Sequence, residues 1–499
     1  MTRRLDGATL RGPLELTADV VVVGSGVAGA AFAREAAALG AAVVVVEAGR
    51  WFEPPDFPLA SFDAMALMYR DLGASVVLGP MPAPYVQGRM VGGSSPINGA
   101  ICWRLPRDVY DEWLTADPAL RDALPWDELE AVTDSLETRL NVRPTDPTIA
   151  GRKNQLLARG AEALGLEHRP IRRNVSGCEG LGRCMQGCPN GRKLSVDATL
   201  LADAEAAGTR VVSAVEVREL DLSRGRCVGV RGVTPAGHSV RVKAASVVLA
   251  ASAIQTPVLL MANGLRHGPV GQNFQCHPGV SMAGRFPEPV RMWEGATQGH
   301  EVIGLRHEGL KFEALGFGTA VLAGRLRGVG RELSREFDDM DHQLDWGAAV
   351  RAEARGRVLR MGRHPVVLFS PSARDVALFR RGLRVMGEMM LAAGADFVDP
   401  GVRGAVARTS KVADLVALEA SGPRFAGAYT AAITHMFGTC RMGSDPQQSV
   451  VRPDFRHHAV QGLYVADSSV FPTSTGVNPQ IPIMALATMC ARRALRSPP

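Results

Sequence analysis

The chain lacks several features that would place it in a broad class of protein. No apolar run reaches membrane-spanning length without a glycine or a charge, so we expect no transmembrane segment. The arginines near the N-terminus are not followed by an apolar segment in residues 1–16, which argues against a signal peptide and predicts a cytoplasmic protein. Eight cysteines in 499 residues are too few for a disulfide scaffold.

An excess of one sign of charge is also missing. The 56 lysines and arginines nearly balance the 50 aspartates and glutamates, so the net charge of +6 does not indicate a nucleic-acid partner. The densest basic stretch, residues 351–364, predicts an exposed strand edge in preference to a nucleic-acid or membrane patch. Five tyrosines and six tryptophans give little support for a sugar-stacking pocket. Glycine is abundant, with 54 residues, and together with the length it predicts many turns and two or three packed domains.

The first motif starts at a β-branched run, residues 19–23, which is typical of a strand buried on both faces. The sequence Gly24-Ser25-Gly26-Val27-Ala28-Gly29 follows and leads into an alanine-rich stretch that predicts a helix as far as Leu39. A second predicted strand, residues 42–46, ends at Glu47. A strand, a glycine-rich turn, a helix and a strand with a terminal acid together indicate a dinucleotide-binding unit.

Each residue type in this unit has a physical reason for its place. Gly24 permits the tight turn, Gly26 lets a pyrophosphate approach the backbone, and Gly29 lets the helix pack closely against the strand. Backbone N–H groups at the helix start, next to Ser25, would face the phosphates. The carboxylate of Glu47 can accept hydrogen bonds from a ribose diol and would repel the extra phosphate of an NADP-type ligand. The unit alone does not choose between FAD and NAD.

Residues 87–100 form a second candidate segment for binding a cofactor. They are rich in glycine and small polar residues, and they lie between hydrophobic flanks. They also contain a run of potential backbone donors, which distinguishes them from an ordinary surface turn. Such a segment can lie against a planar, polar ring system.

The C-terminal part of the chain supplies candidate reacting groups. His435 lies in the segment Thr-His-Met-Phe-Gly-Thr-Cys-Arg-Met-Gly, and Asn478 and Pro479 follow about forty residues later. Histidine suits a general base because its pKa lies near neutral pH. Asparagine can donate a hydrogen bond to an oxygen on which negative charge builds, but it cannot take a proton. Pro479 is a favourable first residue for a helix predicted over 481–493.

In their order, these segments and Gly462-Leu463-Tyr464-Val465-Ala466-Asp467 resemble the glucose–methanol–choline (GMC) oxidoreductase family, and the matches span nearly the whole chain. The resemblance implies an α/β fold (α+β overall), with a Rossmann-like FAD-binding domain and a substrate domain built on an antiparallel sheet. Some relatives attach FAD through a histidine near residue 95. This sequence has Pro96-Ile97-Asn98 there, so we expect FAD to be held noncovalently.

The resemblance also implies which residues contact the cofactor. It places Gly92, Gly93 and Asn98 beside the flavin ring. It matches Val217 with a strand residue whose backbone contacts the adenine. Asp467 matches a residue near the pyrophosphate and the ribityl chain.

For the reaction, the resemblance matches His435 with the catalytic histidine of the family. Asn478 matches the second active-site position, which is filled by histidine in some relatives and by asparagine in others. We therefore predict that an alcohol loses a hydride to flavin N5 while His435 takes the hydroxyl proton. The helix after Pro479 would direct the positive end of its dipole at the flavin and stabilise the anionic reduced form.

Several aspects of the implied activity stay open. The electron acceptor can be oxygen, a quinone, an artificial acceptor or a carrier protein. Some family members are hydroxynitrile lyases that keep FAD without redox turnover, so a lyase is the alternative function. A resemblance to a branch of bacterial long-chain alcohol oxidases and dehydrogenases favours a lipophilic alcohol as the small-molecule substrate.

Three cysteines, Cys178, Cys184 and Cys188, fall within eleven residues and are followed by Pro189. Their spacing is similar to that of an iron–sulfur loop. Some dehydrogenase relatives carry a three-iron cluster at a similar loop, with an additional cysteine where this sequence has Gly177. We prefer a structural loop, with or without a disulfide, over an iron–sulfur or zinc site, and we predict no metal ligand.

The family pattern predicts a discontinuous FAD-binding domain over residues 15–282 and 426–499. It includes an arm of helices and the cysteine loop over 106–199. A substrate-binding domain is predicted over 283–425, between the two parts.

Three further predictions concern local structure. The alternating pattern around residues 319–326 predicts a strand of the antiparallel sheet, and residues 373–392 read as a helix. His277, in a Cys-His-Pro turn, is interpreted as structural. His457 and His458 lie in a polar stretch and are expected to be exposed.

Overall fold

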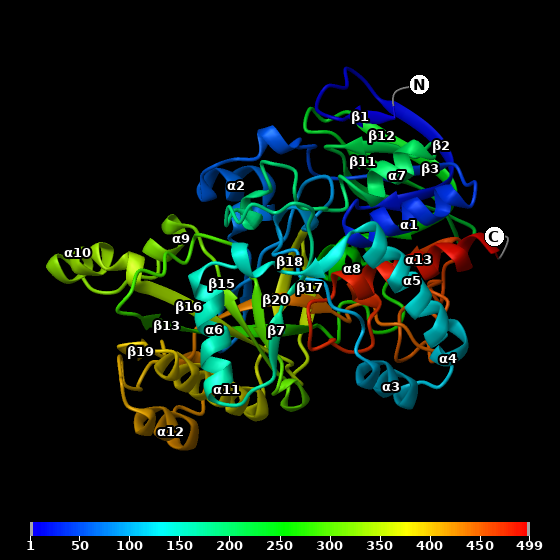
Figure 1. The fold of residues 1–499 in the computed structure, drawn as a ribbon. Coiled ribbons are helices and arrows are strands. Elements are labelled where there is room, and N and C mark those ends of the chain that lie inside the picture. Colours follow the sequence, from blue (N-terminus) through cyan, green and yellow to red (C-terminus); the bar gives the residue numbers. More distant parts are fainter. Residues whose placement is uncertain (1–2, 497–499) are drawn as a thin grey trace.

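The computed structural model describes residues 3–496 and contains two large β-sheets with helices packed around them (Figure 1). One sheet is mostly parallel and the other is antiparallel. Strand β1 (Arg4–Asp6), near the start of the described residues, and helix α13 (Gln480–Arg496), at their end, both lie on the side of the mostly parallel sheet (Figure 1). Within the described residues, no helix combines the length and the apolar character needed to cross a membrane.

The mostly parallel sheet is the Rossmann-like part. Its strands are β1 (Arg4–Asp6), β2 (Leu14–Val23), β3 (Val43–Val46), β9 (Arg210–Ser213), β10 (Glu216–Ser223), β11 (Arg226–Val233), β12 (Ser239–Leu249) and β21 (Leu463–Val465). They have the order β1-β9-β3-β2-β12-β11-β10, with β21 beside β12. The valine runs 20–23 and 43–46 pair in parallel and are buried, as a continuous β-branched run predicts.

The antiparallel sheet forms the second large layer. Its strands are β7 (His168–Pro170), β13 (Gln275–Arg285), β14 (His300–Val302), β15 (Leu310–Leu315), β16 (Gln343–Val350), β19 (Phe397–Asp399) and β20 (Ala431–Phe437). Their order is β19-β13-β16-β15-β14-β7, and β20 pairs with β13. The sheet buries one face against a long helix in a separate hydrophobic core that includes Trp346 and Phe379.

Two smaller sheets complete the strands. One contains β4 (Val76–Leu78), β5 (Ala83–Pro84), β17 (Arg357–Met361) and β18 (His364–Leu368), in the order β17-β18-β4-β5. The other pairs β6 (Val142–Pro144) with β8 (Arg172–Asn174). Strand β17, within the basic stretch 351–364, is an exposed edge strand, which confirms the strand-edge part of that prediction.

The helices of the described chain are α1 (Val27–Ala38), α2 (Ser61–Met68), α3 (Arg107–Ala116), α4 (Leu120–Ala123), α5 (Trp126–Arg139), α6 (Arg152–Ala163), α7 (Leu200–Ala206), α8 (Ser252–Ala262), α9 (Thr319–Ala323), α10 (Arg331–Asp338), α11 (Ala373–Ala392), α12 (Val412–Ser421) and α13 (Gln480–Arg496). Helices α1, α11 and α13 lie where the sequence predicted helices. Helix α11 has the predicted bounds because Ser372 and Asp375 form a capping box at its start. Helix α13 begins directly after Pro479, as expected.

The prediction of a strand around residues 319–326 is wrong, because residues 319–323 form helix α9. An alternating pattern this short cannot separate a strand from one turn of helix. Gly318 has an extended backbone just before α9, and only Leu322 of the helix is buried. The antiparallel sheet itself is present and is built from other segments.

The prediction that His457 is exposed is also wrong. Its exposed fraction is 3%, because residues 451–457 fold back against the chain near β21. The backbone N–H of His457 donates to the carbonyl of Leu463 at 2.8 Å. His458 is half-buried, and its Nε2 lies 2.9 Å from the hydroxyl of Ser449. A polar local sequence did not reveal this packing against a distant strand.

The domain boundaries at 282 and 426 stay a prediction. Residue 282 lies inside β13, and β13 pairs along its length with strands of the antiparallel sheet. Strand β20 lies after residue 426 and pairs with β13 as well. The part of the chain that contains His435 therefore belongs to the antiparallel sheet rather than to the Rossmann-like sheet.

Candidate active site

A cavity of about 1060 Å³ is lined by residues from both large sheets. The predicted site residues on its wall are Gly24, Gly26, Glu47, Gly93, Asn98, Val217, His435, Asp467, Asn478 and Pro479. Ser25, Gly29 and Gly92 do not line it. The structure thus brings most of the predicted cofactor and reacting residues to one place.

The glycines of the first motif differ in what surrounds them. A Cβ atom on Gly29 would lie 1.9 Å from the carbonyl oxygen of Gly24, so the packing of α1 against β2 excludes any side chain there. A Cβ atom on Gly26 would meet only the Cα of Gly93, at 3.9 Å. The protein itself has room for a side chain at Gly26, and the space faces the cavity. This is the fit that a pyrophosphate close to the backbone requires.

Glu47 is buried at the end of β3 and organises the same turn. Its Oε2 accepts hydrogen bonds from the N–H and the hydroxyl of Ser25, at 2.9 and 2.8 Å. Its Oε1 accepts from the N–H of Gly49 at 2.8 Å. The hydroxyl of Ser25 also accepts from the N–H of Gly92 at 3.0 Å, which joins the first motif to the segment 87–100. Contact of Glu47 with a ribose diol stays a prediction.

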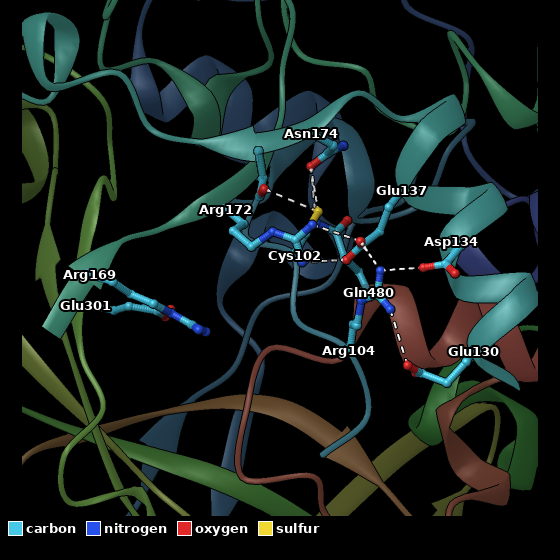
Figure 2. Close-up of polar contacts among 11 residues, drawn as sticks. Cys102, Arg104, Glu130, Asp134, Glu137, Arg169, Arg172, Asn174, Glu301 and Gln480 are labelled. Atoms are coloured by element: carbon cyan, nitrogen blue, oxygen red, sulfur yellow. Dashed lines mark hydrogen bonds and ion pairs between the residues drawn. The ribbon is translucent and has the colours of Figure 1, made fainter. Parts of the chain in front are cut away.

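Asn98 is held in place by Gln480, the first residue of α13. Its Nδ2 donates to Gln480 Oε1 at 3.2 Å. The Nε2 of Gln480 donates to the carbonyl of Ile101 at 2.7 Å and to Asn174 Oδ1 at 3.2 Å. Figure 2 shows the Gln480 side chain close to Asn174. One amide thus fixes the start of α13 against the segment 87–100.

Behind Gln480, an ion-pair network anchors the helical arm (Figure 2). Glu137 of α5 is bound by Arg172 of β8 at 2.7 Å and by Arg104 at 2.6 Å. The carboxylate is 7% exposed, so these pairs lie in a partly desolvated setting. They connect α5 to the strand that carries Asn174.

Asp467 lies just after β21 and is engaged by backbone donors. Its Oδ1 accepts from the N–H of Ser469, and its Oδ2 accepts from the N–H of Ser252 at the start of α8, both at 2.9 Å. Burial raises the pKa of Asp467, although these hydrogen bonds oppose the shift. Val217 of β10 is half-buried and lines the cavity near this region of the Rossmann-like sheet. Their contacts with adenine and ribityl chain stay predictions.

His435 lies on a β-bulge. His277 of β13 pairs with Thr434, whereas Gln275 pairs with Phe437. Between these two pairs, β20 therefore contains one residue more than β13. The extra residue places His435 at φ +50°, a strained conformation for a residue other than glycine. Bulges re-aim side chains next to active sites, and His435 lines the cavity.

Both ring nitrogens of His435 have a partner. Nδ1 lies 3.1 Å from Nδ1 of His277, and Nε2 lies 3.3 Å from Nδ2 of Asn478. The backbone N–H of Gly476 donates to Nε2 of His277 at 3.0 Å. A neutral His277 therefore carries its hydrogen on Nδ1 and donates it to His435. The neutral His435 then carries its own hydrogen on Nε2.

This hydrogen explains the setting of Asn478. The Oδ1 of Asn478 is buried and has no hydrogen-bond partner among residues 3–496. Rotation of the amide by half a turn brings Oδ1 to the Nε2 hydrogen of His435. In the unrotated orientation, an amide N–H of Asn478 can donate to a ligand oxygen. Asn478 can therefore serve either as an acceptor or as a donor.

Burial, followed by the positive charge of Lys311, lowers the pKa of His435 to about 3. Burial and the neighbouring His435 likewise lower the pKa of His277 well below its ordinary value. Both rings are therefore neutral at neutral pH. A neutral ring is the form that can take a proton from an alcohol.

The cysteine loop, residues 178–188, contains free thiols, so the disulfide considered for it is not formed. No group of three or more His, Cys, Asp or Glu side chains in the described chain is arranged to hold a metal ion. Nη2 of Arg173 lies 3.1 Å from Sγ of Cys184, and Nζ of Lys193 donates to the carbonyls of Cys184 and Asn98 at 2.8 and 3.0 Å. Burial opposes ionisation, but Arg173 and Lys193 outweigh it and lower the pKa of Cys184.

Sequence models of the GMC oxidoreductase family match residues 18–279 and 354–487. The chain belongs to this family. It is similar to an uncharacterized GMC-type oxidoreductase of Mycobacterium tuberculosis, with 35% identity over 96% of this chain and 76% of that protein. It is also similar to a long-chain-alcohol oxidase of Arabidopsis thaliana, with 26% identity over 97% of this chain and 69% of that protein.

A solved structure supports the fold. The chain is similar to pyridoxine 4-oxidase from Mesorbium loti, with a TM-score of 0.73 and 20% identity over 96% of this chain and 99% of that one. The family membership confirms the resemblance that the sequence motifs indicated and makes FAD the cofactor of this GMC oxidoreductase. The long-chain-alcohol oxidase relative is a plant protein, whereas the sequence motifs suggested a bacterial branch.

Sequence reasoning missed the positions of two residues in this site. His277 was interpreted as structural, yet its ring meets that of His435 although the two are 158 positions apart. Gln480 was quoted only as part of Asn-Pro-Gln and received no role. The Cys-His-Pro and Asn-Pro-Gln sequences carried a signal, but only strand pairing shows which residues meet.

Proposed function

We propose that this GMC oxidoreductase oxidises an uncharged alcohol to a carbonyl compound, with His435 as the base and Asn478 as the hydrogen-bonding partner of the substrate oxygen. The enzyme is an FAD-dependent oxidoreductase that acts on alcohols. The observation that carries the residue assignment is the shared cavity. The glycine cradle for the cofactor and the pair His435–Asn478 line the same space.

Bound FAD supplies the hydride acceptor for this reaction. The protein supplies two groups at one wall of the cavity, because Nε2 of His435 and Nδ2 of Asn478 lie 3.3 Å apart. An alcohol hydroxyl beside this pair, within reach of both nitrogens, can give its proton to His435. The amide of Asn478 then donates to the oxygen as negative charge builds there. Noncovalent attachment of FAD is part of this proposal, since Pro96-Ile97-Asn98 offers no histidine.

The contact with His277 sets a condition on the proton step. In the resting arrangement the hydrogen of His435 lies on Nε2, so Nε2 cannot yet accept. Proton uptake requires this hydrogen on Nδ1 instead, donated to His277. His277 accepts it only when its own hydrogen moves to Nε2 and the contact with the Gly476 N–H opens. The loop that carries Gly476 thus belongs to the proposed mechanism.

Two ion pairs on the cavity wall favour an uncharged substrate, although Arg363 lines the exposed rim without a carboxylate partner in the described chain. Asp345 and Arg325 both line it and pair at 3.1 Å, and Asp399 and Arg327 do the same at 3.1 Å. These side chains offer a ligand no unbalanced charge. Phe317 and other apolar residues share the wall, which supports a lipophilic alcohol.

The test is anaerobic reduction of the flavin by a panel of alcohols. We expect primary alcohols of increasing chain length to bleach the visible flavin band, and we expect choline and 2-hydroxy acids to bleach it poorly. If FAD stays bound and no alcohol bleaches it, alcohol oxidation is refuted, and cleavage of a cyanohydrin then tests the lyase alternative. Reoxidation of the bleached enzyme by oxygen, compared with a quinone or a dye, identifies the acceptor.

A further inference from the structure

The small sheet β17-β18-β4-β5 has two very different faces. Its inner face is apolar and fully packed. Val77, Val358 and Val367 are buried there, in one cluster with Phe274 and Phe369. Successive residues of a strand point to opposite faces, so the neighbours of each valine along its own strand face outward.

The outer face is apolar and exposed. Leu359, Met361, Val76 and Leu78 have exposed fractions of 43%, 69%, 43% and 48%. Leu359 pairs with Val366 across the β17–β18 hairpin, and β18 runs beside β4, so these side chains lie on neighbouring strands. We call Leu359, Met361, Val76 and Leu78 the outer patch. A contiguous exposed apolar patch on a sheet marks an interaction surface more often than chance.

Positive charge surrounds the outer patch. Arg355, Arg357, Arg360 and Arg363 are all exposed on or next to the β17–β18 hairpin. None of them forms an ion pair with a carboxylate in the described chain. The sequence has no aspartate or glutamate over residues 354–374. The apolar strands and this basic rim therefore occur together on one surface.

The outer patch reaches an opening of the cavity. Arg363 lies in the turn between β17 and β18, and it lines the cavity while it is exposed to solvent. Val86 lies just after β5, lines the cavity as well and is 48% exposed. A partner that covers the outer patch would also face this opening.

We propose that the outer patch and its arginines dock the protein onto the surface of a bilayer that contains anionic lipids. Apolar side chains enter the boundary between headgroups and acyl chains, and arginines contact lipid phosphates. A second copy of the chain is disfavoured because a two-fold contact through this surface would bring the unpaired arginines of both copies together. Docking does not depend on alcohol oxidation. Only its consequence, direct entry of a lipophilic alcohol from the bilayer, rests on the proposed function.

The experiment measures binding of the FAD-loaded full chain to vesicles by co-sedimentation. Vesicles of phosphatidylcholine alone are compared with vesicles that contain phosphatidylcholine and phosphatidylglycerol in equal parts. We expect binding to the anionic vesicles that weakens as salt is raised. R357Q/R360Q should bind about 25-fold more weakly, since each arginine near an anionic surface contributes about fivefold. L359S/M361S should bind at least about tenfold more weakly.

Two matched controls separate this surface from general stickiness. L39S/L222S removes two other exposed apolar residues, Leu39 at the end of α1 and Leu222 on β10. R11Q/R266Q removes two other exposed arginines. Both should bind vesicles like the unaltered protein. Flavin reduction by a short water-soluble alcohol, measured without vesicles, should be unchanged in all four variants.

Three outcomes overturn the proposal. The first is no binding of the unaltered protein to anionic vesicles. The second is binding that the outer-patch variants leave unchanged. The third is a dimer in analytical ultracentrifugation that L359S/M361S dissociates, which would assign the surface to a second copy. Failure of the proposed function would show instead as absent flavin bleaching, whatever the vesicles report.

Discussion

The two halves of the active-site cavity are built on opposite principles. On the Rossmann-like side, valine strands are buried and the cavity wall includes backbone next to glycines such as Gly26 and Gly93. On the other side, the wall is an antiparallel sheet with the loop after α9, and Arg325 of that loop pairs with Asp345 of β16. The first half therefore lets a ligand approach the backbone closely, and the second half presents side chains that meet from distant segments.

Buried charge is the clearest expression of this difference. Lys311 of β15 is 1% exposed, lies 2.9 Å from Glu301 Oε2 and also pairs with Glu313. Glu301 is bound in addition by Arg169 at 2.9 Å, and the two residues lie side by side in Figure 2. A comparable ion cluster is not needed around the glycine turn, where Glu47 is satisfied by N–H groups and a hydroxyl. The substrate half therefore depends on charge balance, and the cofactor half depends on close backbone packing.

The largest expected effect is on the stability of the cofactor half, where substitution of Gly29 should be harmful and substitution of Gly26 should not. Gly29→Ala places a methyl group 1.9 Å from the Gly24 carbonyl oxygen, so we expect the protein to lose about 3 kcal/mol of stability or to fail to fold. Gly26→Ala has room, so the FAD-free protein should unfold at the temperature of the unaltered protein. It should still bind FAD at least about tenfold more weakly, since the methyl group enters the ligand space.

Thermal unfolding of the FAD-free proteins and a fluorescence titration with FAD separate the two roles. Equal stability of Gly29→Ala and the unaltered protein would contradict the packing argument. Unchanged FAD affinity of Gly26→Ala would show that the pyrophosphate lies elsewhere.

The second effect concerns the reacting pair, where the two halves meet. His435→Ala should retain FAD and lose about 10²–10⁴-fold in the rate of anaerobic flavin reduction, because the proton has no acceptor. Asn478→Ala should lose less, about 10²-fold, because the charge on oxygen loses one donor. His458→Ala is a matched control, since this half-buried histidine does not line the cavity. Near-normal reduction by His435→Ala would remove its assignment as base.

The same comparison explains how far the sequence predicted this molecule. The turn from Gly24 to Gly29 and the buried strand before it follow from residue types that are adjacent in the chain, so both were predictable. The helix over 373–392 was predictable for the same local reason. His277 and Gln480 were not, because their roles arise from the pairing of β13 with β20 and from a contact across 382 positions with Asn98.

The third effect breaks the charge balance of the substrate half. Lys311→Met leaves Glu301 and Glu313 buried together without their shared cation, so we expect a loss of about 3–5 kcal/mol in the free energy of unfolding. Denaturant unfolding measures it. Asp111→Asn, which breaks the exposed pair of Arg107 and Asp111, is the control and should cost less than about 1 kcal/mol. Equal small losses would show that the buried cluster does not support the sheet.

A fourth effect tests the contact between the two histidines. His277→Leu removes the ring that orients His435 and that accepts its Nδ1 hydrogen in the productive arrangement, so flavin reduction should slow by about tenfold or more. His277→Asn keeps an amide group near the Nδ1 position and should recover part of the rate. Circular dichroism checks that the buried substitutions fold. Equal rates for the Leu and Asn variants would mean that His277 only fills space.

The smallest expected effect is the response to pH above about 5. The pKa of His435 is lowered to about 3, so its neutral form is fully populated above that range and is lost only as the pH falls through the folded pKa. Flavin reduction should therefore change less than about twofold between pH 5 and 8, whereas a histidine with an ordinary pKa would lose activity below about 6.5. The measurement is stopped-flow reduction after a rapid pH jump.

The jump is needed because the same shift acts on stability. Burial lowers the pKa of His435 and lowers that of His300 to about 4, so below about pH 6.5 the unfolded chain binds more protons than the folded protein. Stability is complete above that pH and falls as the pH drops toward the folded values. A slow loss of activity at pH 4 to 5 with an unchanged initial rate would come from unfolding of the substrate half. A drop in the initial rate near pH 6 would instead contradict the low pKa of His435 and restore an ordinary, solvated base.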